Sequence, residues 1–247
     1  MQTKTITVET KIKNADFIAI QELANLYSFL QRTIYNKIAE NGPTRKLHNK
    51  LKKEYIAKYK IHARMFNSIW KEAKGKYDSL KELKKFNEKQ IKQQIKETKK
   101  KIKGIKSKLK KKRITPQENK KLKFYLFKCK NRLNKLNKKL NKEFDPSIVF
   151  GTREFYKKQW TDDKYGNNHK LWQKEWRRKR NNHFYFIGSK DERNGNQLCQ
   201  YIVENKILRI TLPYCLQKDK KKYIEIPVDF YSDNKKKNEQ YFNYFHQ

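Results

Sequence analysis

Three arginines and two tryptophans lie close together in the second half of this chain. Arg177, Arg178 and Arg180 follow Trp172 and Trp176. Guanidinium planes and aromatic rings stack on unpaired bases, and arginine also pairs with phosphate. The grouping therefore predicts contact with RNA. The alternative is that the two tryptophans belong to the core and the arginines are simply exposed.

A second candidate surface lies on a stretch with helical periodicity near residue 70. Phe66, Ile69, Ala73, Tyr77 and Leu80 step by three or four, which defines one apolar face. The rest of this stretch carries basic and polar side chains: Arg64, Asn67, Ser68, Lys71, Lys74 and Lys76. Contact with phosphates is one interpretation of these residues, and an ordinary solvated helix face is the other.

A third group of polar side chains lies in the stretch "FIGSKDERNGNQLCQ". Asn194 and Asn196 flank Gly195, and Gln197 follows. Gly and Asn favour tight turns that need a positive φ. We therefore expect these residues mainly to form a turn between two strands, with nucleic-acid contact as a second possibility.

The cysteines and histidines do not form a metal or disulfide pattern. Cys129, Cys199 and Cys215 are odd in number and widely separated, and none belongs to a Cys-x-x-Cys pair. The five histidines share no ligand spacing with them or with one another. We expect no cofactor, no metal ion and no disulfide framework.

The charge balance points to a polyanionic partner. The 247 residues include 63 Lys and Arg against 25 Asp and Glu, a formal net charge of +38, and only eleven of the basic residues are Arg. Self-repulsion on this scale favours neutralisation by nucleic acid, and the 13% aromatic residues suit base stacking. An anionic membrane surface, or a genome bias toward lysine, would also fit. The N-terminus has no apolar signal region and no apolar run is long enough for a membrane span, so we expect a cytoplasmic protein without membrane association.

Periodicity predicts mainly helices before residue 147. Residues 3–12 alternate like a half-buried strand, and a helical face then runs from Phe17 to Ile38 and stops at "NGP". Between Leu80 and Leu140, apolar residues recur at heptad-like spacing in two arms, separated by "TPQE". Thr115, Pro116 and Glu118 have the spacing of a capping box with proline at the first helical position. The sequence predicts two long antiparallel helices joined along one seam.

The pattern changes after "DPSIVFG". Short helices are expected around Trp160, Trp172 and Trp176. Strands are expected in "HFYFIGS", "NQLCQYIVENKILRITLP" and "KKYIEIPVDF", with a hairpin turn at Glu204 to Lys206.

In order along the chain, "IVFGTREFYKKQW", the Trp/Arg-rich stretch, "FIGSKDERNGNQLCQ" and "LRITLP" resemble the N-terminal half of TnpB proteins. These are transposon-associated RNA-guided nucleases of the OrfB family, related to the compact type V CRISPR effectors. The opening strand, "FIAIQELANLYSFLQRTIYNKI" and "FNSIWKEAKGKY" are similar to the start of the same family.

The resemblance implies an α+β fold in which a wedge-type β-barrel is interrupted by an inserted helical lobe. Residues 1–13 would form the first wedge strand and residues 14–146 the recognition lobe, with a coiled-coil hairpin at 80–143. Residues 147–247 would form an incomplete remainder of the barrel. The long hairpin is more extended than the lobe of that family usually is.

The same resemblance implies a guide-type RNA and double-stranded DNA as partners. The helix with Asn67, Ser68, Lys71 and Lys74 would face the duplex that flanks the target, where amides and hydroxyls read base edges and lysines hold phosphates.

The resemblance also implies a RuvC-like nuclease half that binds two Mg²⁺ ions through carboxylates, and the chain ends where that half should begin. Glu225, Asp229, Asp233 and Glu239 lie instead in the last expected strand and a polar tail. We therefore expect no catalytic residues and no enzyme activity from this chain. A separate RuvC-containing chain would have to supply cleavage.

The function expected from these observations is a nucleic-acid-binding module of a truncated or split TnpB-like protein. The competing expectation is a coiled-coil structural or interaction protein with non-specific RNA or DNA binding.

Overall fold

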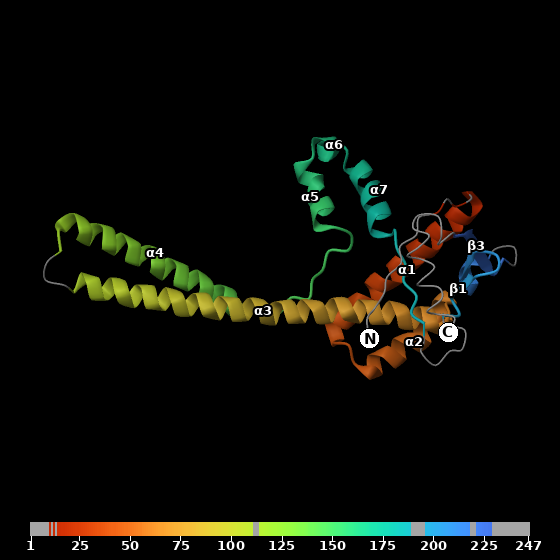
Figure 1. The fold of residues 1–247 in the computed structure, drawn as a ribbon, viewed down its shortest axis with the longest axis horizontal. Coiled ribbons are helices and arrows are strands. Elements are labelled where there is room, and N and C mark those ends of the chain that lie inside the picture. Colours follow the sequence, from red (N-terminus) through yellow and green to blue (C-terminus); the bar gives the residue numbers. More distant parts are fainter. Residues whose placement is uncertain are drawn as a thin grey trace. The chain divides into compact units, whose positions relative to one another are not determined.

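A computed structural model describes residues 10, 12, 14–110, 114–188, 196–217 and 221–228 of this protein, and Figure 1 shows the order of its elements. Within these residues the chain forms seven α-helices and three strands. It divides into two compact units. The first contains the described residues up to Lys74 and those from Ile148 onward, and the second is Gly75–Ser147.

The core of the first unit is built around α1 (Asn14–Asn41). The predicted apolar row of this helix is confirmed from Leu23 onward, since five of its members are fully buried: Leu23, Tyr27, Leu30, Ile34 and Ile38. Phe17, which was predicted for the same row, is 48% exposed. The helix ends at "NGP" as predicted, because Gly42 has a φ of +73° and its N–H donates to the carbonyl of Ile38 at 2.8 Å.

The next two helices close over this row. α2 (Arg45–Tyr59) starts at Thr44, whose side chain accepts the N–H of Leu47, and buries Leu51 and Tyr55. α3 (Ala63–Leu109) buries Phe66 and Ile69 in its first turns.

A polar network joins one side of this core to the segment that contains His183. The hydroxyl of Tyr27 donates to the Glu72 carboxylate at 2.8 Å, and Nε2 of His183 lies 3.3 Å from the other Glu72 oxygen. Burial, and then the Glu72 carboxylate, raise the pKa of Tyr27, so the phenol stays protonated and keeps donating. The network joins α1, α3 and the segment that contains His183.

Three short helices follow residue 150. They are α5 (Arg153–Thr161), α6 (Asp163–Gly166) and α7 (His169–Arg180). Their N-caps are Thr152, Asp162 and Asn168, each of which accepts a backbone N–H of its own first turn.

The strands form one small open sheet. β1 (Cys199–Ile202), β2 (Ile207–Thr211) and β3 (Tyr223–Pro227) pair in that order, and both pairings are antiparallel. The predicted hairpin turn is confirmed at Val203–Lys206, where Lys206 has a φ of +52°. A short 3₁₀ helix, η1 (Tyr214–Leu216), precedes β3. One face is buried through Ile210, Ile224 and Ile226, and β3 contacts α1.

The predicted wedge β-barrel is wrong for the residues that the structure describes, which are mostly helical. Two edges of the three-stranded sheet stay open, whereas a barrel needs every strand paired on both sides. The strand expected in "HFYFIGS" is not one of the three: the backbone N–H of Ile187 donates instead to the side-chain oxygen of Ser68. The first expected strand lies outside the described residues apart from Thr10 and Ile12, and the hydroxyl of Thr10 donates to the carbonyl of Pro227.

The second unit is a helical hairpin made by the rest of α3 and by α4 (Pro116–Leu140) (Figure 1). The predicted capping box is confirmed. The Thr115 hydroxyl accepts the N–H of Glu118 at 3.2 Å, and the Thr115 N–H donates back to the Glu118 carboxylate at 3.2 Å.

The two arms of the hairpin meet along a seam of half-buried and buried side chains. On α3 the seam residues are Glu88, Ile91, Ile95, Thr98, Ile102, Ile105 and Leu109, and on α4 they are Leu122, Leu126, Cys129, Leu133, Leu136 and Leu140. Both sets alternate steps of three and four, as the heptad-like spacing predicted.

Candidate nucleic-acid interface

One side of the hairpin carries a regular row of lysines. Each member directly follows a seam residue of α3: Lys89, Lys92, Lys96, Lys99, Lys103, Lys106 and Lys110. All seven side chains are exposed, and none has an ion pair among the residues that the structure describes. At a rise of 1.5 Å per residue, this lysine row extends over about 32 Å, close to one turn of a nucleic-acid duplex.

No carboxylate interrupts the lysine row. Glu97 is the one acidic residue between positions 89 and 110. It precedes the seam residue Thr98, so it points to the other side of the hairpin, where Gln93 donates to it at 2.9 Å. The row therefore presents unpaired positive charge at a spacing suited to a polyanion.

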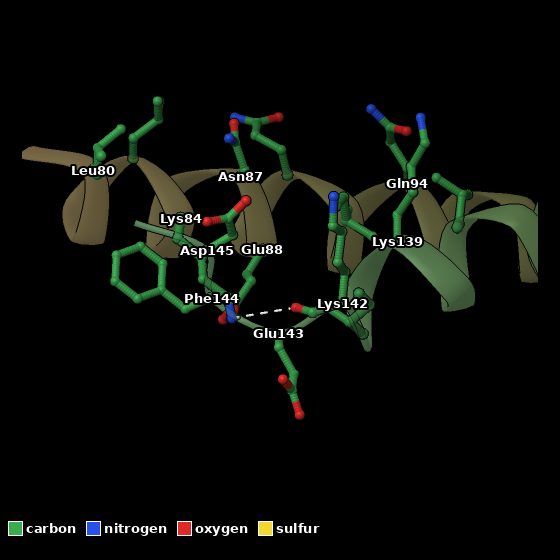
Figure 2. Close-up of a pocket in the computed structure, with 15 residues that line it drawn as sticks. Leu80, Lys84, Asn87, Glu88, Gln94, Lys139, Lys142, Glu143, Phe144 and Asp145 are labelled. Carbon is green, nitrogen blue, oxygen red and sulfur yellow. Dashed lines mark hydrogen bonds and ion pairs between the residues drawn. The ribbon is translucent and has the colours of Figure 1, made fainter. Parts of the chain in front are cut away.

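Residues of α4 extend the same side. In an antiparallel pair, residues that follow the seam on the two helices point the same way, as do those that precede it. Gln94 and Lys139 illustrate this, since each precedes a seam residue and Figure 2 shows them pointing together. On the lysine-row side α4 places Lys123, Phe127 and Lys130, and Phe127 is 59% exposed.

Phe124 adds another exposed ring on α4. It is 58% exposed and lies 4.5 Å from the Lys128 ammonium. Exposed aromatic rings among lysines are the combination that binds unpaired bases and their phosphates together.

An open groove of about 570 Å³ lies at the base of the hairpin (Figure 2). Lys84 lies in it 3.6 Å from Glu88, donates to the carbonyl of Lys142 at 3.3 Å and lies over the ring of Phe144. Glu143 and Asp145 also line it. Lys84 is thus already paired, and carboxylates lie around it, so the groove does not suit a polyanion. Its contacts instead hold the segment that follows α4 against α3.

The polar residues predicted on the first turns of α3 differ in how exposed they are. Asn67, Lys71 and Lys74 are exposed along one face, and Arg64 and Lys76 are half-buried. Ser68 is 1% exposed and accepts the N–H of Ile187 at 3.1 Å. Ser68 is therefore not on the surface that a nucleic acid could contact.

The two predicted tryptophans are in a core. Trp172 and Trp176 are buried with Tyr165, and they stack on each other with centroids 5.8 Å apart and rings 11° from parallel. The Trp172 indole N–H donates to the carbonyl of Phe155 at 3.3 Å. Neither ring is open to a base, which favours the core interpretation that the sequence left open.

Trp160 was not among the predicted binding residues, although its ring is more accessible than those of Trp172 and Trp176. It is 68% exposed on α5 and makes an edge-on contact with Tyr156, with centroids 5.3 Å apart. The signal was present in "YKKQW", where two lysines precede the ring.

The predicted arginines have different surroundings. Arg177 and Arg178 are exposed on the last turn of α7, whereas Arg180 is half-buried. Burial, and then the charge of Arg177, lower the pKa of Arg180. Arg32 of α1 comes into the same neighbourhood by donating to Asn181 at 2.8 Å. No local sequence pattern links Arg32 to Arg180, because about 150 residues separate the two arginines.

The polar turn residues support a strand. The Asn196 side chain accepts the N–H of Leu198 at 3.0 Å, and the Gln197 carbonyl accepts the Thr211 hydroxyl at 3.1 Å. The Gln197 side chain is exposed. Asn194 and Gly195 lie outside the described residues.

The described residues offer neither a metal-binding cluster nor a membrane-spanning helix. They contain no group of three or more His, Cys, Asp and Glu side chains that could hold a metal ion. None of the helices in this part of the chain combines the length and the apolar character needed to cross a membrane.

Comparisons with protein-family models, with curated proteins and with solved structures found no match to this chain.

Proposed function

We propose that this protein binds nucleic acid and that the hairpin of residues 75–147 is its main phosphate-contacting surface. The observation that carries the proposal is the lysine row: seven exposed lysines in heptad register along about 32 Å, with no carboxylate on their side of α3. A coiled coil requires particular residue types only along its seam, so the outer positions need not all be lysine. Identical charge at every one of these outer positions is costly in self-repulsion, and a polyanion would offset that cost.

RNA with unpaired bases is the form of nucleic acid that the side chains favour. Phe124 and Phe127 lie on the same helix as lysines, and Trp160 follows Lys157 and Lys158. Exposed rings contribute little to a fully paired duplex, whose bases are already stacked, but they stack well on loops and single strands.

A narrower proposal is that the RNA is a guide-type RNA of a TnpB-like system, with double-stranded DNA as a second partner. Its support is the order of the quoted motifs, and it does not rest on a barrel. In this proposal the chain binds without cutting, and a separate RuvC-containing chain supplies cleavage. The proposed compartment is the cytoplasm, where the three free thiols stay reduced.

The competing function is coiled-coil assembly. The apolar seam supports it, because heptad seams also mediate pairing between chains. The seam side chains are already half-buried or buried within the hairpin, which leaves less apolar surface for another chain. A mass that rises with protein concentration in the absence of RNA would favour this alternative.

The proposal is tested by removing part of the lysine row. A variant with Lys92, Lys96, Lys99 and Lys103 all changed to Gln keeps helix propensity and removes four phosphate contacts. The matched control changes four exposed basic residues that precede the α4 seam, on the other side, to Gln: Lys121, Arg132, Lys135 and Lys139.

Binding to a fluorescent single-stranded RNA is measured by anisotropy at several salt concentrations. Near 0.15 M salt the row variant is expected to bind about 100-fold more weakly. The slope of log K against log salt should become shallower by about three, because each of the four lost contacts contributes about 0.7–0.9 to that slope. The control is expected to lose less than about 10-fold. Equal losses in both variants would mean undirected charge attraction and would count against the row as the site.

The narrower proposal has its own measurement. RNA that co-purifies with the tagged protein after a moderate-salt wash is sequenced. One enriched transcript encoded beside the gene supports guide binding, and bulk ribosomal and transfer RNA opposes it. Mg²⁺-dependent cleavage by the chain alone would contradict the proposal of binding without catalysis.

A further inference from the structure

Two arginines from distant parts of the chain are held in one neighbourhood without a carboxylate. Arg32 of α1 and Arg180 at the end of α7 are both half-buried. Neither has an ion pair with any residue that the structure describes. Charged side chains that lose solvent normally gain an opposite charge, so this pairing calls for an explanation.

The packing that brings them together is specific. Arg32 Nη1 donates to the side-chain oxygen of Asn181 at 2.8 Å. One turn on, Tyr35 packs edge-on against Phe150, with centroids 5.5 Å apart. Gly151, next to Phe150, has a φ of +88°, and a Cβ there would lie 3.4 Å from the Arg180 Cβ. α1, the turn at 150–151 and the end of α7 thus meet around the two arginines.

Arg180 also has an unused donor. Its Nε is buried and makes no hydrogen bond to any described residue. A buried donor without a partner destabilises the folded state. Consistent with two cations that oppose each other, burial and the charge of Arg180 lower the pKa of Arg32 to about 10.

The helix dipole does not account for this arrangement. The C-terminal end of a helix carries roughly half a negative charge, and the last turn of α7 already places Arg177, Arg178, Lys179 and Arg180 there. Arg32 adds a fifth cation from another element. An external anion would offset the repulsion between Arg32 and Arg180.

We infer that Arg32 and Arg180, oriented by Asn181 and the Gly151 turn, form a binding site for a phosphate group. Two guanidinium forks offer paired N–H donors in the planar geometry that matches phosphate oxygens. The phosphate belongs either to a nucleic-acid strand or to a free phosphate. The site does not depend on the lysine row and stands if that surface fails its own test.

The experiment measures the melting temperature of the full chain in chloride and with up to 10 mM inorganic phosphate, at matched ionic strength. Arg32→Gln and Arg180→Gln each remove one fork. Arg45→Gln is the matched control, because Arg45 is exposed and has no ion pair among the described residues. Low phosphate keeps the general stabilising effect of phosphate salts small.

For the wild type we expect a saturable rise in melting temperature with phosphate. Arg32→Gln and Arg180→Gln should lose at least tenfold in apparent phosphate affinity, and Arg45→Gln should keep it. In chloride the two site variants should melt at or above the wild type, since removing one cation relieves repulsion. Unchanged phosphate affinity in both site variants, or an equal loss in Arg45→Gln, would overturn the site.

Should a site variant fold poorly, Arg180→Lys keeps the charge and removes only the fork. It should lose about tenfold in phosphate affinity by direct calorimetric titration, and retained affinity would overturn the inference.

A second experiment distinguishes a nucleic-acid phosphate from a free phosphate. Arg32→Gln is added to the four-lysine row variant, and binding of single-stranded RNA is measured. A further loss of about tenfold assigns a nucleic-acid phosphate. Loss of the phosphate effect without a change in RNA affinity assigns a free phosphate.

Discussion

Ser68 shows how burial decides between two roles for one side chain. Its residue type and its position on the helix suited contact with bases. Ser68 is nevertheless 1% exposed, and its hydroxyl oxygen accepts the N–H of Ile187 at 3.1 Å. The neighbouring Asn67 is exposed on the same helix. The two residues therefore allow stability and binding to be separated by single substitutions.

We expect Ser68→Ala to lower the free energy of unfolding by about 1 kcal/mol, because the Ile187 N–H loses its acceptor while staying half-buried. RNA affinity should not change. Asn67→Ala is the control and should leave stability within about 0.5 kcal/mol. Chemical denaturation and anisotropy check both quantities. A Ser68→Ala protein of unchanged stability and weakened RNA binding would show that the buried role is incorrect.

At the scale of elements, the hairpin depends on a local signal at its turn. The Thr115 and Glu118 bonds satisfy backbone donors where α4 begins. Loss of such a cap costs roughly 0.5–2 kcal/mol. Since α4 packs only through its seam, this cost should appear as local opening.

Thr115→Ala should therefore speed hydrogen exchange of the first α4 amides about 5- to 10-fold, as a loss of about 1 kcal/mol implies. The helices of the other unit should exchange at unchanged rates. Gln117→Ala changes an exposed residue of the same turn that takes no part in the capping box and should have little effect. Slower exchange throughout the chain, or no change in α4, would contradict a stabilising cap.

The cap and the helix periodicities were predictable because both are local in sequence. α1 and α4 begin or end where "NGP" and "TPQE" indicate. The sheet was harder, since the strand pattern in "HFYFIGS" says nothing about whether a partner strand exists, and Ile187 bonds to Ser68 instead. The spacing of the lysines in the row is visible in the sequence. That they all lie on one side of the hairpin is clear only once the seam residues are known. Arg32 and Arg180 meet through tertiary packing alone.

At the scale of the whole molecule, charge is unevenly divided. Residues 75–147 hold 27 of the 63 Lys and Arg and only seven of the 25 Asp and Glu. Just over half of the +38 net charge thus lies in less than a third of the chain. Salt should act on this charge in two opposite ways, depending on whether a polyanion is bound.

For the free protein, raising NaCl from 20 to 500 mM should increase the melting temperature by several degrees, because screening weakens self-repulsion and about 1 kcal/mol corresponds to roughly 2–4 °C at this chain length. For the RNA complex, added salt should instead weaken binding, by about 10³-fold between 50 and 200 mM if seven lysines each displace a counterion. Scanning calorimetry and anisotropy on one preparation measure both effects. The row variant should show a smaller thermal gain and a shallower binding slope together, since both arise from the same lysines. A steep slope with no thermal gain would mean that other residues of the chain neutralise the row before RNA binds.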